Sequence, residues 1–183
     1  MANNCYNHVL ISGDKLILDE LQEKFNSELK KESFQKFAAS FFSEGYITDS
    51  VNLGSKWWDL WTERNEDRHL MVIGDSAWCP PDEFLRLISL HYPVKIVNEY
   101  EEPGEGFGGT TTYQYGDVED TCYTYLEWLW VSGCDQFWEE VRCYAENCED
   151  FAEFKETYLD NFFTPLSEKD LQDIEKEFNF VNN

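Results

Sequence analysis

A glycine-rich loop in the middle of the chain has the spacing of a nucleotide-binding motif. Its glycines fit the pattern G-x-G-x-x-G: Gly104, Gly106 and Gly109. That motif binds a pyrophosphate because backbone N–H groups and a helix N-terminus meet the phosphates. Here Glu101, Glu102 and Glu105 crowd the loop, and residues 110–113 (Thr-Thr-Thr-Tyr) are typical of a strand. We therefore predict that the glycines shape a bulge or tight turn and bind no dinucleotide.

Cysteine and histidine side chains, the usual soft metal ligands, are scattered along this chain. The six cysteines contain no Cys-x-x-Cys pair: Cys5, Cys79, Cys122, Cys134, Cys143 and Cys148. The three histidines also lie far apart: His8, His69 and His91. A tetrahedral zinc site normally takes two close-spaced pairs, and only Cys143 and Cys148 come near that spacing. We predict no metal and no cofactor, with the thiols buried and reduced.

No catalytic set stands out by a local signature, neither Ser-His-Asp nor Cys-His. Acidic residues number 37, so a pair at glycosidase spacing would arise by chance. Four tryptophans have the chemistry of a base-stacking platform: Trp57, Trp58, Trp61 and Trp78. Such a platform also needs a positively charged groove, which this composition does not favour, so we place these rings in the core. The prediction is a protein without enzymatic activity.

The first part of the chain predicts alternating strands and helices. Residues 5–11 are typical of a strand. Asp14 then caps a helix whose apolar side chains recur at helical spacing: Leu18, Leu21, Phe25 and Leu29. Lys30 and Lys31 fall in its last turn, where cations suit the helix dipole. Residues 33–53 are consistent with a short helix or with a strand.

The next elements complete a recognisable order. Paired strands are expected at residues 56–61 and 68–74, with a turn at 64–67. A second helix begins at Pro80-Pro81-Asp82-Glu83 and is stopped by Pro93, with these inward side chains: Phe84, Leu87, Ile88 and His91. A strand at 94–100 precedes a hairpin of residues 107–115 and 118–126, which turns at Gly116-Asp117. The order β-α-β-β-α-β predicts an α+β, ferredoxin-like split βαβ fold with an antiparallel sheet and an added hairpin.

From residue 134 onward the apolar side chains recur at helical spacing. One stripe consists of Phe137, Val141, Tyr144, Ala145 and Cys148. A second consists of Phe151, Phe154, Tyr158 and Phe162. Ser167 caps a third helix with these side chains inside: Leu171, Ile174 and Phe178. We predict a ferredoxin-like domain at residues 1–120 and an acidic helical extension at residues 121–183.

The acidic residues are concentrated in the second part of the chain. Residues 1–100 carry 16 acids and 10 bases, a net of −6, whereas residues 101–183 carry 21 acids and 4 bases, a net of −17. Such a field repels nucleic acid and anionic membranes and favours a basic protein partner. No apolar run reaches the roughly 18 residues of a membrane span, and no secretory signal opens the chain. These features predict a cytoplasmic protein.

The acidic helices have a charge density that can be compared with that of nucleic acid. Residues 135–160 carry two bases and nine acids: Asp135, Glu139, Glu140, Glu146, Glu149, Asp150, Glu153, Glu156 and Asp160. A net of −7 over 26 residues is one charge per roughly 5.6 Å of helix. One DNA strand carries about one charge per 3.4 Å. The density permits mimicry of nucleic acid, while a solvated outer face on amphipathic helices explains it equally simply.

Four segments together resemble a known family. They are Asn4-Cys5-Tyr6-Asn7-His8-Val9-Leu10-Ile11-Ser12-Gly13-Asp14, Leu53-Gly54-Ser55-Lys56-Trp57, Ser76-Ala77-Trp78-Cys79-Pro80-Pro81 and Tyr100-Glu101-Glu102-Pro103-Gly104-Glu105-Gly106-Phe107-Gly108-Gly109. In this order they resemble the YubB-type ferredoxin-like domain of plasmid- and phage-borne proteins. The chain departs from the usual residues at Asn4, Leu53, Ser55, Ser76 and Cys79. The resemblance covers residues 3 to about 118 and implies the fold and a mobile-element origin. It carries no activity and no catalytic residue.

The leading functional hypothesis is a non-enzymatic inhibitor from a phage or plasmid, acting in the bacterial cytoplasm. It would occlude the basic groove of a nucleic-acid-handling host defence protein, such as a CRISPR effector or a restriction enzyme. Carboxylates at helical spacing would stand in for phosphates. The expected partner-binding residues are Glu139, Glu140, Glu146, Glu149, Asp150, Glu153, Glu156, Asp160, Glu101, Glu102 and Glu105.

The alternative hypothesis is an enzyme or small-ligand protein. It would use the face near Trp57, Trp78 and the 101–109 loop, where the resemblance concentrates its distinctive residues. The negative field favours a neutral or cationic ligand over a phosphate ester. Structural roles explain the same residues equally well, because Gly and Pro set turns and Trp fills cores.

Overall fold

The computed structural model describes residues 3–48, 50–66 and 68–182, of which residues 64–66 are described by their backbone alone. The chain divides into two compact units. The first consists of Met1–Glu105 and Gly109–Thr121, and the second of Gly106–Gly108 and Cys122–Asn183. Each unit has its own hydrophobic core, and each is described by itself below.

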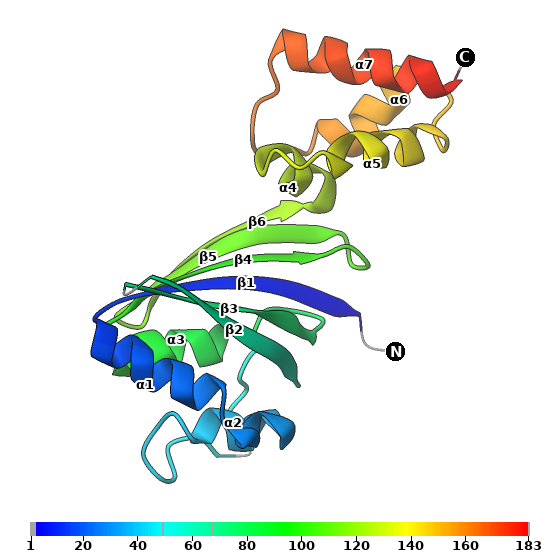
Figure 1. Cartoon of the computed structure of the whole chain (residues 1–183). Helices are drawn as coiled ribbons and strands as arrows, with labels where there is room; N and C mark the ends of the chain where they lie inside the picture. Colours follow the sequence, from blue (N-terminus) through cyan, green and yellow to red (C-terminus); the bar gives the residue numbers. More distant parts are fainter. Residues whose placement is uncertain (1–2, 49, 67, 183) are drawn as a thin grey trace. The chain divides into compact units, whose positions relative to one another are not determined.

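A six-stranded antiparallel sheet is the centre of the first unit, which we call the sheet unit (Figure 1). Its strands lie in the order β2-β3-β1-β4-β5-β6. Their bounds are β1 Asn4–Ser12, β2 Trp58–Glu66, β3 His69–Ala77, β4 Lys95–Glu102, β5 Phe107–Gln114 and β6 Asp117–Thr124. The first four strands have the order of the split βαβ fold, so the fold is α+β and ferredoxin-like, as predicted. The last two strands are the added hairpin.

Alternation of side chains determines the register of the sheet. In β1 the buried residues are Cys5, Asn7, Val9 and Ile11, every second position, so one face of the strand lies against the helices. Antiparallel pairing places Asn4 opposite Ala77 in β3 and Tyr6 opposite Glu101 in β4. The predicted turn at residues 64–67 differs from the structure, because β2 continues to Glu66; Asp67 lies outside the described residues.

Two helices of the sheet unit cover one face of the sheet (Figure 1): α1 (Lys15–Phe25) and α3 (Asp82–His91). Asp14 caps α1 as predicted, since its side chain accepts a hydrogen bond from the Leu16 N–H at 2.9 Å. The helix ends at Phe25, so Leu29 and the two lysines after it belong to a separate 3₁₀ turn, η1 (Glu28–Lys31), and Leu29 is exposed. His91 was expected inside but is exposed at the end of α3, whereas Leu85 is fully buried.

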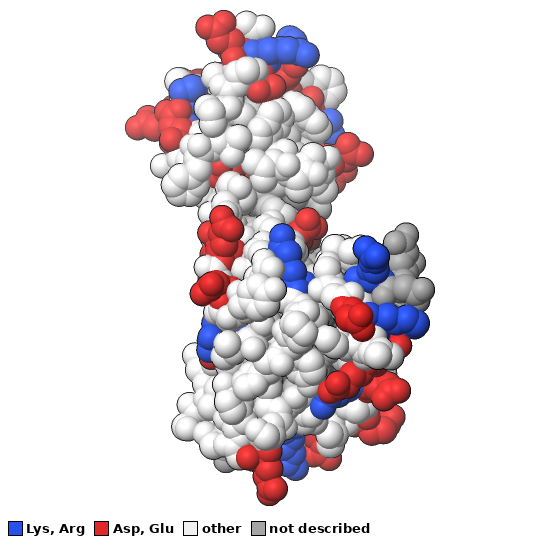
Figure 2. Space-filling view, turned by 90° about the vertical axis from the view of Figure 1, so that its left-hand side faces the viewer, with Lys and Arg blue, Asp and Glu red and all other residues white. Residues whose placement is uncertain are grey.

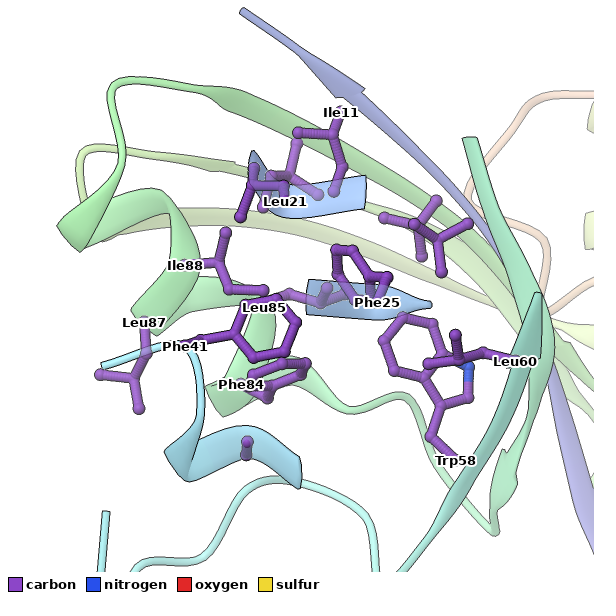
Figure 3. Close-up of a cluster of buried hydrophobic side chains, with 14 of the residues drawn as sticks. Ile11, Leu21, Phe25, Phe41, Trp58, Leu60, Phe84, Leu85, Leu87 and Ile88 are labelled. Carbon is purple, nitrogen blue, oxygen red and sulfur yellow. The ribbon is translucent and has the colours of Figure 1, made fainter. Parts of the chain in front are cut away.

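Aromatic rings fill the core between this sheet and its helices (Figure 3). The segment that was left open between helix and strand forms the short helix α2 (Phe34–Ala39), which contributes Phe34 and Phe37. Phe84 of α3 is fully buried, with its ring centroid 5.1 Å from that of Phe41. Such edge-to-face pairs contribute stability beyond the burial of apolar surface.

The structure corrects the tryptophan assignment. Trp58 is 5 % exposed and packs in the core, but Trp57, Trp61 and Trp78 are 36, 48 and 51 % exposed. Successive strand residues point to opposite faces of a sheet, so Trp58 faces the helices and Trp61 faces the other side. Trp57 and Trp78 lie just beyond the ends of β2 and β3.

The added hairpin turns one residue earlier than predicted. Its turn residues are Tyr115 and Gly116, with φ angles of 54° and 84°. Two consecutive positive φ angles define the type I′ turn that joins hairpin strands most directly. β6 also ends earlier than predicted, at Thr124, where a helix that the sequence did not indicate begins.

The second unit is helical, and we call it the helical unit. Its helices are α4 (Tyr125–Val131), α5 (Gln136–Ala145), α6 (Phe151–Phe154), the π-helical turn η2 (Lys155–Leu159) and α7 (Glu168–Asn182). The predicted stripes supply its core, in which Phe137, Val141, Phe154, Ile174 and Phe178 are buried. None of the helices in the described part of the chain has the length and the apolar run needed to cross a membrane.

Candidate functional site

The four segments with distinctive residues meet at one end of the sheet. The start of β1 and the segment after β3 are joined there, because the Trp78 N–H donates to the Asn3 carbonyl at 3.0 Å. The loop after β4 joins the same end through the Asn3 side chain, which donates to the Glu105 carboxylate at 3.2 Å. The segment before β2 is held by a bond from the Ala77 N–H to the Trp57 carbonyl at 3.2 Å. The structure therefore brings together the residues of the alternative hypothesis.

Several of these residues have structural roles. The Ser55 hydroxyl is bonded to both the N–H and the carbonyl of Ala77, at 2.8 and 3.1 Å. The Cys79 thiol donates to the Gly54 carbonyl at 2.8 Å. Gly54 has a φ of +94°, and a Cβ at that position would lie 2.6 Å from the Asp82 nitrogen. Glycine is required here by both the backbone conformation and the close approach of the next segment.

Replacing Gly54 with alanine is expected to destabilise the sheet unit by about 1–3 kcal/mol, because a side chain must adopt a positive φ and displace the start of α3. The free energy of unfolding from urea titration measures this. Gly45→Ala is the matched control, since Gly45 lies in the same unit and also has a positive φ, of +80°, but a Cβ there meets nothing within 4 Å. Equal losses for the two variants would contradict the packing role of Gly54.

The side chain of Trp78 has no evident packing role at this end. Its φ is +72°, which is a strained conformation for a bulky residue, and half of its side chain is exposed. The Lys56 ammonium lies 5.7 Å from the centroid of its ring. Both residues line a hollow of about 400 Å³. Its other lining residues are Gln35, Asn52, Leu53, Gly54, Ser55, Ala77 and Cys79.

A second hollow, of about 450 Å³, shares Asn52 and Gly54 with the first and extends to Val118 of β6. Asp82 also lines it, and the Asp82 carboxylate accepts a hydrogen bond from the Tyr113 hydroxyl. Burial raises the pKa of Asp82 to about 6, although the Tyr113 hydrogen bond lowers it in part and the nearby charge of Asp120 raises it further. In the same hollow Arg86 binds the Glu83 carboxylate through two bonds of 2.7 Å.

Asp82 should make the stability of the sheet unit depend on pH. Its folded-state pKa is raised, so its contribution is fully present below about pH 3.8 and is lost as the pH rises through about 6. The free energy of unfolding of Asp82→Asn, relative to that of the wild type, should therefore increase by about 1–3 kcal/mol as the pH is raised from 4 to 8. Urea titrations at the two pH values measure this change. A difference between variant and wild type that stays constant across this range would contradict the raised pKa.

The thiols in this region are poorly suited to nucleophilic chemistry. Burial raises the pKa of Cys5 to about 12, and burial together with Asp82 raises the pKa of Cys79. Among the described residues, no group of three or more His, Cys, Asp and Glu side chains is arranged to hold a metal ion. His8 lies on the opposite face of the sheet, 3.8 Å from the Glu99 carboxylate.

The glycine-rich loop is a turn between β4 and β5, as expected. Glu102, a predicted partner-binding residue, is instead 1 % exposed, and its carboxylate accepts a hydrogen bond from the Glu105 N–H inside the turn. The physical reason is the alternation in β4, which turns Glu102 to the buried face. Glu101 is half-buried, and Glu105 is exposed.

The predicted acidic residues of the helical unit lie on its outside, apart from Glu140, which is half-buried. Glu139 and Glu140 belong to α5, and Glu146 caps its end. Asp150 and Glu153 cap the start of α6: the Asp150 carboxylate accepts from the Glu153 N–H at 2.9 Å, and the Glu153 carboxylate accepts from the Glu149 N–H at 2.7 Å. Those two acids therefore have structural roles.

The remaining predicted acids fall into two groups. Asp160 forms an ion pair with Lys155 at 2.6 Å. The acids whose side chains are exposed and available to a partner are Glu139, Glu146, Glu149 and Glu156, which we call the acidic set. In the view of Figure 2, acidic side chains lie around the margin of the helical unit and a broad uncharged area lies between them.

Comparison with known proteins gives one family match. Residues 57–130 match the family model of the ferredoxin-like domain in Api92-like protein. The match includes Trp57, the 76–81 segment and the 101–109 loop, and it extends past β6 into α4. The crystal structure of protein api92 from Yersinia pseudotuberculosis is similar with a TM-score of 0.46 and 10 % identity, over 66 % of this chain and 98 % of that chain. No curated protein matches the sequence.

Sequence reasoning did not identify the residues that line the two hollows. Asp82 was recognised only as an acid at the start of a helix, and Asn52 and Arg86 carried no motif. Their one sequence signal is proximity, since each lies within a few residues of a distinctive segment. The hollows form only when segments that are well separated in the chain meet, such as 52–56 with 77–79 and 82–86 with Val118.

Proposed function

We propose that this chain is a non-enzymatic binding protein that occludes a basic, nucleic-acid-handling protein through the acidic set of the helical unit. One observation carries the proposal. The helical unit has 15 acids and 4 bases, a net of −11, and the acidic set projects from α5, from η2 and from the segment between α5 and α6, in a unit with its own packed core. A preformed, strongly negative surface favours association with a basic groove.

A more specific form of the proposal names the cellular setting of the chain and the class of its partner. The distinctive segments resemble those of YubB-type proteins of plasmids and phages, which supports an inhibitor of host defence in the bacterial cytoplasm. The partner would be a CRISPR effector or a restriction enzyme, whose groove normally holds DNA or RNA. The acidic set would take the positions of phosphates, and exposed aromatic side chains of the same unit, Phe163 and Phe180, would supply anchoring contacts.

Affinity capture tests the proposal. The full chain is immobilised and exposed to lysate of a defence-bearing host, with and without an excess of competing DNA. The expected result is one basic protein that binds DNA on its own and whose capture is reduced by the competitor. Capture that is insensitive to DNA, or of a protein that binds no nucleic acid, would overturn it.

A second function is favoured by the conformation of Trp78. The strained, half-exposed ring beside Lys56 in a hollow of about 400 Å³ is a suitable place for a small neutral or cationic ligand. A thermal-shift screen of nucleotides, amines and divalent ions tests this, because a saturating ligand raises the melting temperature. The shift should disappear in Trp78→Ala and persist in Trp61→Ala, a control on the other face of the sheet. If no compound raises the melting temperature, the compounds screened are excluded as ligands.

A further inference from the structure

β6 is an open edge of the sheet. It is the last strand in the sheet order and is bonded on one side to β5. Seven of its eight residues are exposed. Natural proteins protect such edges with lysine, proline, bulges or a covering segment, because an open edge accepts another strand. The sequence of β6, Asp-Val-Glu-Asp-Thr-Cys-Tyr-Thr, contains neither lysine nor proline.

The turn of the hairpin shows which backbone groups of β6 are available. A two-residue type I′ turn at Tyr115 and Gly116 pairs Gln114 with Asp117, and hence Thr111 with Asp120. The Thr111 hydroxyl does donate to the Asp120 carboxylate, at 2.6 Å. In that register the N–H groups of Val118 and Asp120 point away from β5.

A hollow lies beside this edge, on the side of the sheet that faces the helices. It extends from the first turns of α3 to Val118, which is 48 % exposed. Asp82 contributes a carboxylate to it, while the charges of Glu83 and Arg86 compensate one another. Asp120 belongs to the same face of β6 as Val118. A side chain from a strand added to β6 can therefore enter the hollow. The negative charge at the hollow favours a cationic side chain.

The charges of β6 select the kind of strand that can be added. Asp117, Glu119 and Asp120 would face like charges if a second copy of β6 paired with it, which is unfavourable. A segment that carries lysine or arginine would face opposite charges. Charge complementarity and the open edge thus favour the same occupant.

We propose that the edge of β6 binds an extended, lysine- or arginine-bearing segment of a partner protein by strand addition, with a basic side chain in the hollow beside Asp82. The inference takes the basic character of the partner from the proposed function but places the contact on a different surface. Backbone hydrogen bonds to Val118 and Asp120 would hold the segment, and the hollow would select its side chain.

Peptide binding to the full chain tests the inference. The probe is a fluorescent peptide of alternating lysine and valine, and its glutamate–valine counterpart is the control. The lysine peptide should bind and the glutamate peptide should not. N-methylation of one alternate set of its amides should weaken binding about tenfold or more, and N-methylation of the other set should have a small effect. Equal effects of the two sets, or no binding of the lysine peptide, would overturn strand addition.

Two protein variants locate the contact. Val118→Pro removes an outward N–H and should weaken binding about tenfold, whereas Val118→Ala keeps that N–H and should weaken binding less than Val118→Pro does. If circular dichroism shows that Val118→Pro is unfolded, the two N-methylated peptides decide the question. Self-association of the chain that Val118→Pro abolishes would identify a second copy as the occupant and contradict the inference.

A third variant separates this inference from the proposed function. Substitution of lysine at Glu139, Glu146, Glu149 and Glu156 removes the acidic set but leaves β6 intact. The variant should bind the lysine peptide within about threefold of the wild type, because none of the four substitutions changes a residue of β6 or of the hollow. Loss of peptide binding in this variant alone would place the peptide on the helices and refute the β6 site.

Discussion

Lysine at the four positions of the acidic set, Glu139, Glu146, Glu149 and Glu156, is expected to weaken binding to the captured basic partner several-hundred-fold. Each reversal removes a favourable charge contact and introduces a repulsive one, at about 1 kcal/mol per exposed side chain. Four such changes give about 4 kcal/mol, and Kd changes about tenfold per 1.4 kcal/mol. Isothermal titration calorimetry of the purified pair measures the change.

The choice of positions keeps the helical unit folded. Asp150 and Glu153 are left unchanged because they cap α6. A matched control reverses four exposed acids of the sheet unit: Glu23, Glu28, Glu44 and Glu63. That control has the same net charge, so an equal loss of affinity in the two variants would show that net charge, rather than the acidic set, determines binding.

Replacing Phe84 with alanine is expected to lower the free energy of unfolding of the sheet unit by about 3–5 kcal/mol. The ring is fully buried, and its centroid lies 5.1 to 6.4 Å from those of six other aromatic side chains: Phe25, Phe34, Phe37, Phe41, Phe42 and Trp58. Removal of the ring loses its burial and leaves a cavity that neighbours on several elements cannot fill together. Urea titration followed by circular dichroism measures the loss.

A conservative variant checks the physical reason for that loss. Phe84→Leu keeps most of the apolar volume and should cost about 1–2 kcal/mol. If Phe84→Ala cost less than about 1 kcal/mol, the core around α3 would be loosely packed, contrary to the buried ring cluster of Figure 3.

Local signals in the sequence predicted much of the fold correctly. Asp14 caps α1 because a short acidic side chain can accept the free N–H groups of a helix start. The alternation in β1 and the helical spacing in α5 and α7 identify the buried faces directly. These features depend on residues that are close in the chain, so they are readable without the structure.

Features that depend on distant contacts were not predictable in the same way. Leu29 continues an apolar spacing past the end of α1, and His91 is the last residue of α3, so only the positions of the helix ends show that the two residues are exposed. Trp57 and Trp78 were assigned to the core by residue type, but both lie beyond strand ends. Glu102 belonged to an acidic run that suggested a surface, although strand alternation buries it.

The candidate sites also include features that can be predicted from local sequence and features that depend on distant contacts. The four residues of the acidic set are exposed, as is usual for carboxylates without a buried partner, and their role in binding stays a prediction. The hollow beside Trp78 arises where the 52–56 and 77–79 segments meet, and the hollow beside Asp82 arises where the 51–54 and 82–86 segments meet β6, so no single segment reveals either of them.

Displacement of nucleic acid is the most direct test of an acidic surface that occupies a nucleic-acid groove. The captured partner is loaded with fluorescent DNA, the full chain is titrated in, and anisotropy reports the bound fraction. We expect the wild-type chain to release the DNA when about one equivalent of chain per partner has been added. The variant with lysine at the acidic set should not release it. DNA that stays bound while the chain also binds the same partner would contradict the account.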